Sequence, residues 1–394
     1  MKKANQSFEL AFFLVIFLAI IADSALLPYY PILFEEFLEI QNSSYVGLYM
    51  AMLSIVAMLA MPLWVWLSNK FYYLNLLIIA QISAGVFAIL CVSFSSRLYF
   101  FIFSLLMIAC KASYLLIYPF VLEQQKKSHL KTIQIFTVLI NLGFVLGAIM
   151  GGGILDYFLA QEIFYVIGII DFSQAAICLA LYLNLPKTKT FSKNSSTAYQ
   201  RVEKHKEEGL TKDFIAVILA IFLFYSGSFV TRPFFVDYLS SSSFSYDASI
   251  SGMIYSIPFV MAIVAICLSD NNSLRKWKSV PMSLLILALT SLLQILPSSI
   301  LIIICRVLFG WALFQVSVAL DWLAYAKRDS QDKKTTYMMI NYSQNFGVIV
   351  AYYFAGASAQ KYGLETPLLL GAMFFLVLFF IFITKRNLYV FNNQ

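Results

Sequence analysis

Twelve long apolar runs constrain the fold of this chain more than any other feature. A helix needs about 20 apolar residues to cross the roughly 30 Å hydrocarbon core of a bilayer. The chain is 61% hydrophobic and only 12% charged, whereas soluble domains are about one quarter charged. The runs are Phe8–Phe34, Tyr45–Leu67, Leu74–Phe94, Leu98–Leu122, Ile133–Phe158, Ile163–Leu185, Phe214–Val236, Ile250–Leu268, Val280–Leu296, Ile300–Ala326, Tyr337–Ala359 and Thr366–Thr384.

The backbone within these runs is expected to be helical. Unpaired backbone groups in hydrocarbon each cost several kcal/mol, so only helices or closed barrels span a bilayer. Barrel strands alternate apolar and polar residues, whereas these runs are continuously apolar. We therefore predict an all-α integral membrane protein with twelve transmembrane helices.

Basic residues indicate the orientation of the chain. With the N-terminus inside, the two tails and the even-numbered loops hold 22 of the 27 Lys and Arg residues, and the outer loops hold Arg97 and Lys361. Short cytoplasmic loops carry an excess of Lys and Arg. We therefore predict a protein of the cytoplasmic (inner) membrane with both termini in the cytoplasm. The net charge of +7 follows from this topology, and no nucleic-acid partner is expected.

Metal and cofactor chemistry is not expected. The five cysteines lie inside apolar runs without metal-ligand spacing and read as small buried hydrophobes; they are Cys91, Cys110, Cys178, Cys267 and Cys305. The two histidines, His129 and His205, fall in loops. We find no nucleophile with a base, no metal cluster and no phosphate loop, so we do not expect an enzyme.

A polar stretch divides the chain into two similar halves. We predict a six-helix bundle over residues 1–185, a cytoplasmic linker over residues 186–212 and a second six-helix bundle over residues 213–394. A weak repeat relates the halves at an offset of 204 or 205 residues: Asn141-Leu142-Gly143 matches Asn345-Phe346-Gly347, and Pro28-Tyr29-Tyr30 matches Pro233-Phe234-Phe235. Internal repeats of this kind are typical of secondary transporters.

Nearly the whole chain resembles the major facilitator superfamily. In the loop after the second run, Leu67, Ser68 and Lys70 stand at the leucine, alanine and first arginine of that family's Gly-x-Leu-Ala-Asp-Arg-x-Gly-Arg pattern, while its glycines and aspartate are replaced. The resemblance implies two pseudo-symmetric six-helix bundles.

A glycine pattern in the fifth run also resembles one associated with antiporters of the family. It consists of Gly143, Gly147, Gly151 and Gly152, and Ala148 stands at the expected proline. Glycines four residues apart line one helix face and admit another helix closely. We expect these glycines to serve helix packing or gating, and packing alone also explains them.

Six charges are clear cases of charges placed away from the ends of the apolar runs, at Asp23, Lys111, Asp171, Arg232, Arg306 and Asp321. A charge at the centre of a membrane helix costs about 2.5–3.5 kcal/mol, so such residues usually face a cavity and are functional. Five of the six fall on runs one, four, seven and ten, and the resemblance implies that these helices line a central cavity. Asp171, on run six, is interpreted as structural.

We predict that Asp23 couples transport to protons; the alternative is a static ion pair with Lys111. Lys111, Arg232 and Arg306 are candidate cations for binding an anionic substrate, because arginine suits carboxylate and phosphate. The alternative for the two arginines is snorkelling toward the outer headgroups.

Three uncharged residues complete the predicted substrate site. Tyr30 follows Asp23 by seven residues and Tyr114 follows Lys111 by three, so each shares a helix face with its charge. Asn345 belongs to a polar cluster on run eleven, for which hydrogen bonding between helices is the alternative.

These features predict a secondary active transporter that works by alternating access. The leading hypothesis is a proton-coupled carrier of a small anionic or zwitterionic solute, such as an organic acid or a polycarboxylate siderophore. An efflux pump for amphipathic compounds or multiple drugs is the alternative, and a sensor that does not transport is a remoter one. The expected partners are the solute, protons and the lipid bilayer, and the chain is expected to act as a monomer.

Overall fold

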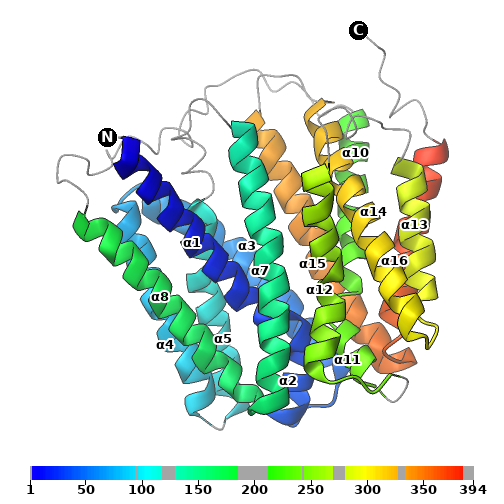
Figure 1. The fold of residues 1–394 in the computed structure, drawn as a ribbon, viewed down its shortest axis with the longest axis horizontal. Coiled ribbons are helices and arrows are strands. Elements are labelled where there is room, and N and C mark those ends of the chain that lie inside the picture. Colours follow the sequence, from blue (N-terminus) through cyan, green and yellow to red (C-terminus); the bar gives the residue numbers. More distant parts are fainter. Residues whose placement is uncertain are drawn as a thin grey trace. The chain divides into compact units, whose positions relative to one another are not determined.

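The computed structural model describes residues 2–94, 96–117, 129–184, 212–241, 244–268, 280–326 and 333–384. These segments are nearly all helical, as Figure 1 shows, and none of them contains a strand. Apart from Lys212, the predicted linker lies outside the described residues.

The chain forms two compact units. The first unit comprises Met1–Leu26 and Ile55–Glu207, and the second comprises Leu27–Ser54 and Glu208–Gln394. These units are defined by contacts rather than by sequence halves, and the predicted division at residues 186–212 stays a prediction.

Six helices and two 3-10 turns of the described residues contribute to the first unit. They are α1 (Lys2–Leu26), the second half of α3 (Ser43–Ser68), α4 (Tyr73–Ser93), α5 (Arg97–Lys111) with the 3-10 turn η2 (Ala112–Leu116), α7 (His129–Tyr157) and α8 (Ile163–Asn184), which the turn η3 (Ala160–Glu162) precedes. Helices α4 and α8 pack side by side, as do α1 and α7. Phe12, Leu77, Phe136 and Cys178 belong to the core of this unit.

The second unit contains the remaining elements. They are η1 (Leu27–Tyr29), α2 (Tyr30–Glu36), the first half of α3, α10 (Lys212–Val230), α11 (Phe235–Ser240), α12 (Ala248–Leu268), α13 (Val280–Leu293), α14 (Ser299–Ala326), α15 (Lys333–Tyr362) and α16 (Thr366–Thr384). Helix α10 packs along α15, and α13 packs on α14 and α16. Phe224, Leu287, Val316 and Phe375 belong to its core.

The predicted all-α membrane fold is confirmed. Ten segments of the described residues are long and apolar enough to cross a membrane, and Val280–Leu293 is a shorter apolar helix. The predicted run Tyr337–Ala359 lies within α15. Each of the twelve predicted runs thus lies wholly or largely in described helix.

Three of the predicted runs are interrupted helices. The first breaks at the 3-10 turn Leu27–Tyr29, which contains Pro28, and the seventh breaks between Val230 and Phe235, around Pro233. Proline has no backbone N–H and clashes with the preceding turn, so it interrupts a helix. The two prolines matched in the sequence repeat therefore interrupt corresponding helices. The fourth run changes from α-helix to the 3-10 turn η2 after Lys111.

Gly143 and Gly347, which the sequence repeat also matches, occupy the same helix contact in each unit. The Ser24 hydroxyl on α1 donates to the Gly143 carbonyl on α7 at 3.0 Å, and the Ser226 hydroxyl on α10 donates to the Gly347 carbonyl on α15 at 3.3 Å. A Cβ atom added to Gly347 would lie 2.8 Å from the carbonyl oxygen of Phe222 on α10. Only glycine permits this close approach of the two helices.

The remaining predicted glycines also lie in α7. A Cβ atom at Gly147 would overlap the Ser24 hydroxyl and lie 2.6 Å from the Ile21 carbonyl oxygen. Gly151 and Gly152 are buried. The geometry of Gly147 supports close packing, and a gating role stays a prediction.

We predict that Gly147→Ala lowers thermal stability while Gly153→Ala, in the same helix, does not. A Cβ atom at Gly153 meets nothing within 4 Å. Overpacking costs about 1–3 kcal/mol, whereas alanine at an open helical position gains up to about 1 kcal/mol. Thermal unfolding of the purified protein in detergent measures both, and equal melting temperatures for the two variants would contradict this packing.

Candidate transport site

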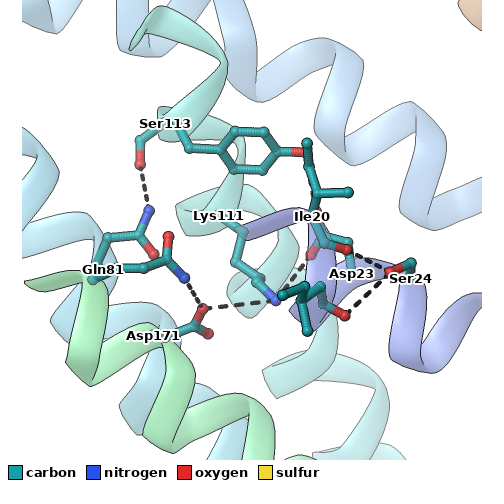
Figure 2. Close-up of polar contacts among 10 residues, drawn as sticks. Ile20, Asp23, Ser24, Gln81, Lys111, Ser113 and Asp171 are labelled. Carbon is teal, nitrogen blue, oxygen red and sulfur yellow. Dashed lines mark hydrogen bonds and ion pairs between the residues drawn. The ribbon is translucent and has the colours of Figure 1, made fainter. Parts of the chain in front are cut away.

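Lys111 lies between two carboxylates in the first unit. Figure 2 shows its ammonium group reaching Asp23 of α1 and Asp171 of α8. The Lys111 Nζ atom is 2.9 Å from Asp23 Oδ1 and 3.8 Å from Asp171 Oδ1. The side chains of Lys111 and Asp171 are 2% and 0% exposed, whereas that of Asp23 is 30% exposed. The lysine thus joins a partly accessible carboxylate to a fully buried one.

The end of α5 explains why Lys111 and Tyr114 reach the same carboxylate. The chain tightens into the 3-10 turn η2 directly after Lys111. Side chains three residues apart eclipse one another in a 3-10 helix. The Tyr114 hydroxyl accordingly donates to Asp23 Oδ2 at 3.1 Å. Asp23 therefore has an ion pair at one of its oxygens and accepts a hydrogen bond at the other.

Asp171 has a different environment. The Gln174 amide donates to Asp171 Oδ1 at 3.1 Å from one turn further along α8. On α4, the Gln81 amide donates to the Ser113 hydroxyl at 3.5 Å. Asp171 Oδ2 and the amide oxygens of Gln81 and Gln174 are buried and have no hydrogen-bond partner among the described residues.

The structure thus brings together Asp23, Lys111 and Tyr114 of the predicted site. It adds Asp171, which sequence reasoning set aside as structural, together with Gln81 and Gln174. The sequence offered one signal for these added residues. Gln174 follows Asp171 by three positions, so two polar residues lie on one face of an apolar helix.

Arg306, on α14 of the second unit, is held by α12. Its guanidinium donates to the Tyr255 carbonyl at 2.6 Å and to the Ile254 carbonyl at 3.4 Å. Pro258 has no N–H for the carbonyl four residues before it, which is that of Ile254. Arg306, only 5% exposed, thus supplies a donor that the helix lacks.

Aromatic rings surround the same guanidinium. The Arg306 Cζ atom lies 4.2 Å from the ring centroid of Phe235 and 5.7 Å from those of Tyr255 and Phe309. Its bonds are therefore directed into the protein rather than toward headgroups. A role for Arg306 in substrate binding stays a prediction.

Arg232 lies in the interruption between α10 and α11. Its Cζ atom is 3.8 Å from the ring centroid of Phe229 and 5.4 Å from that of Phe259. Its side chain forms no ion pair or hydrogen bond with another described residue. Since Phe259 also packs 5.7 Å from the Tyr255 ring, both arginines border one group of aromatic rings.

The other predicted residues of the second unit are engaged locally. The buried Tyr30 ring lies 5.3 Å from that of Tyr49. The Asn345 amide donates to the Asn341 carbonyl at 2.8 Å. The Gln344 amide donates to Asp321 at 3.3 Å. The structure describes these positions without testing whether they bind a substrate.

Comparison with known proteins identifies the family. The family model of the Major Facilitator Superfamily matches residues 12–270. This match covers more than half of the chain, and the chain belongs to the Major Facilitator Superfamily. It is a membrane protein of a transporter family. No curated protein sequence matches at a significant level.

Solved structures of transporters share the fold. A bacterial homologue of the human lysosomal transporter Spinster, in an inward-facing and occupied conformation, is 12% identical with a TM-score of 0.79; the match covers 99% of this chain and 98% of that one. The nucleoside transporter NupG is 14% identical with a TM-score of 0.71 and coverages of 95% and 98%. The human organic anion transporter MFSD10 is 14% identical with a TM-score of 0.67 and the same coverages.

We predict that the cost of losing Arg306 depends on Pro258. Arg306→Gln should lower stability by about 2 kcal/mol, because it removes charged donors from buried carbonyls. In a Pro258→Ala background residue 258 regains its N–H, so the same substitution should cost about 1 kcal/mol less. Melting temperatures of the four proteins give this coupling. An identical cost in both backgrounds would show that Arg306 does not compensate for the proline.

Proposed function

We propose that this chain is a proton-coupled secondary transporter of a small anionic or zwitterionic solute and works by alternating access. The observation that carries the proposal is the division of charge between the units. The first unit holds two carboxylates around Lys111. The second holds Arg232 and Arg306, neither in an ion pair with another described residue.

The carboxylates support the proton-coupling part of the proposal. Asp23 is partly exposed and is held by an ammonium group and a phenol. A proton arriving at Asp23 cancels its attraction for Lys111. Protonation therefore changes the bonding between α1 and the end of α5, and a bonding change of this kind can be linked to a conformational change.

The arginines support an anionic or zwitterionic solute. The Arg232 guanidinium is half-buried against rings and keeps its donors unused among the described residues. A planar guanidinium binds a carboxylate or phosphate through two parallel hydrogen bonds. One protein of the same fold is named an organic anion transporter, which agrees with this solute class.

The topology is part of the same proposal. Lys and Arg residues gather in the tails and even-numbered loops, so both termini are assigned to the cytoplasmic side of the inner membrane. The transporting unit is taken to be one chain.

Uptake into vesicles tests the proposed function. We expect purified protein in liposomes to accumulate a labelled small carboxylate when an inwardly directed proton gradient is imposed, and not without one. The neutral amide of the same compound should compete poorly. Asp23→Asn should abolish gradient-driven accumulation while sparing solute exchange.

A control variant is Asp156→Asn, which changes an exposed carboxylate near the end of α7. It should behave as the wild type does. Accumulation by Asp23→Asn at the wild-type level would refute the role of Asp23, and equal uptake with and without the gradient would refute proton coupling.

A further inference from the structure

The cluster around Lys111 has one negative charge too many. Asp23 and Asp171 contribute two carboxylates and Lys111 contributes one ammonium. The other titratable groups that face it are the Cys110 thiol and the Tyr114 phenol, which are ordinarily neutral. Helix α4 has no charged residue, and those of α7 lie in its first and last turns. A net charge buried at this depth is expensive unless something neutralises it.

The two carboxylates differ in how well their charge is held. Asp23 is partly exposed, its Oδ1 lies 2.9 Å from the Lys111 ammonium, and its Oδ2 accepts a hydrogen bond from Tyr114 at 3.1 Å. Asp171 is 0% exposed, lies 3.8 Å from the ammonium and receives one neutral amide donor. Burial disfavours the charged form of a carboxylate, and hydrogen bonds to the charged form favour it. The excess charge is therefore less well stabilised on Asp171.

Orphaned acceptors point to the same residue. Asp171 Oδ2, Gln81 Oε1 and Gln174 Oε1 are all buried without a hydrogen-bond partner among the described residues. Asp23 Oδ1 and Lys111 Nζ also lack a hydrogen bond of good geometry, but they face each other at 2.9 Å as an ion pair. A deprotonated Asp171 leaves three acceptors with no donor, and each such group costs about 1–3 kcal/mol. A proton on Asp171 provides the missing donor.

We propose that Asp171 is a second proton site, and that Lys111 alternates between the two aspartates. In one arrangement Lys111 pairs with Asp23 while Asp171 holds a proton as a neutral acid. In the other, Lys111 has donated a proton to Asp23 and taken the proton of Asp171, so that Asp23 is the neutral acid and the ammonium pairs with Asp171. Both arrangements contain one proton and carry no net charge. Asp23 is then the group that exchanges protons with water, and Asp171 is the group that holds the proton inside the protein.

The role of this exchange in transport rests on the proposed function, but the proton itself is measurable without a solute. Infrared difference spectroscopy of the purified protein at neutral pH detects the carbonyl band of a neutral carboxylic acid. We expect the wild type to show one such band that disappears in Asp171→Asn. It should also disappear in Asp23→Asn, because Lys111 is then free to neutralise Asp171.

Conservative variants assign the band. Asp171→Glu should shift its frequency, and Asp23→Glu should leave it in place. Asp321→Asn removes a carboxylate on α14 of the second unit and should not affect this band. A band that persists in both asparagine variants, or that shifts with Asp23→Glu, would overturn the proposal, as would no neutral acid band in the wild type.

The two Asp23 variants decide the question even if the Asp171 variants do not fold, because Asp23 is partly exposed and tolerates change more readily. The outcome is also separable from that of the uptake experiment. Proton-coupled uptake without the band refutes only the proposal that Asp171 holds a proton. The band without coupled uptake refutes only the proposed function.

Discussion

The ion pairs of Lys111 are the interaction on which the packing of the first unit depends. An ammonium group that is 2% exposed is tolerated in an apolar bundle only because carboxylates from two other helices face it. Those carboxylates belong to α1 and α8, so one side chain at the end of α5 ties three helices together. A bond of this kind is also easily changed, since one proton on either aspartate redirects it. We propose that the same cluster, besides stabilising the unit, binds the coupled proton.

The second unit satisfies a related constraint with a different residue. Backbone groups inside a membrane protein must find partners within it, and Pro258 deprives the Ile254 carbonyl of its usual donor. Arg306 reaches across from α14 to that carbonyl and its neighbour. A Cβ atom at Gly310, one turn further along α14, would lie 2.9 Å from the Pro258 carbonyl oxygen. A proline-containing helix, a small residue and a buried cation therefore form one packing arrangement. Beside it, the Arg232 side chain forms no ion pair or hydrogen bond with another described residue.

Much of the fold followed from the sequence because hydrocarbon dictates helices of known length, and the runs are long and continuous. The repeat of Pro28 and Pro233 marked corresponding positions, but the helix breaks there depend on local geometry that run lengths do not reveal. The Asp23–Lys111 pair was foreseen as possible from charge and depth. Asp171 was interpreted as structural, and its ion pair with Lys111 was not predicted because it depends on which helices are neighbours. The carbonyl groups that accept from Arg306 could not be predicted for the same reason, because they lie on another helix, where Pro258 leaves one of them without its usual donor.

Thermal stability measured on charge-neutralised variants tests the central claim most directly. Lys111→Met alone removes the counter-ion of the cluster formed with Asp23 and Asp171 and should cost about 3–5 kcal/mol. Adding Asp23→Asn and Asp171→Asn removes the stranded charges, so the triple variant should recover most of that loss. A triple variant as unstable as Lys111→Met would contradict the account, because the lysine would then contribute through its packing and not through the charges that it neutralises.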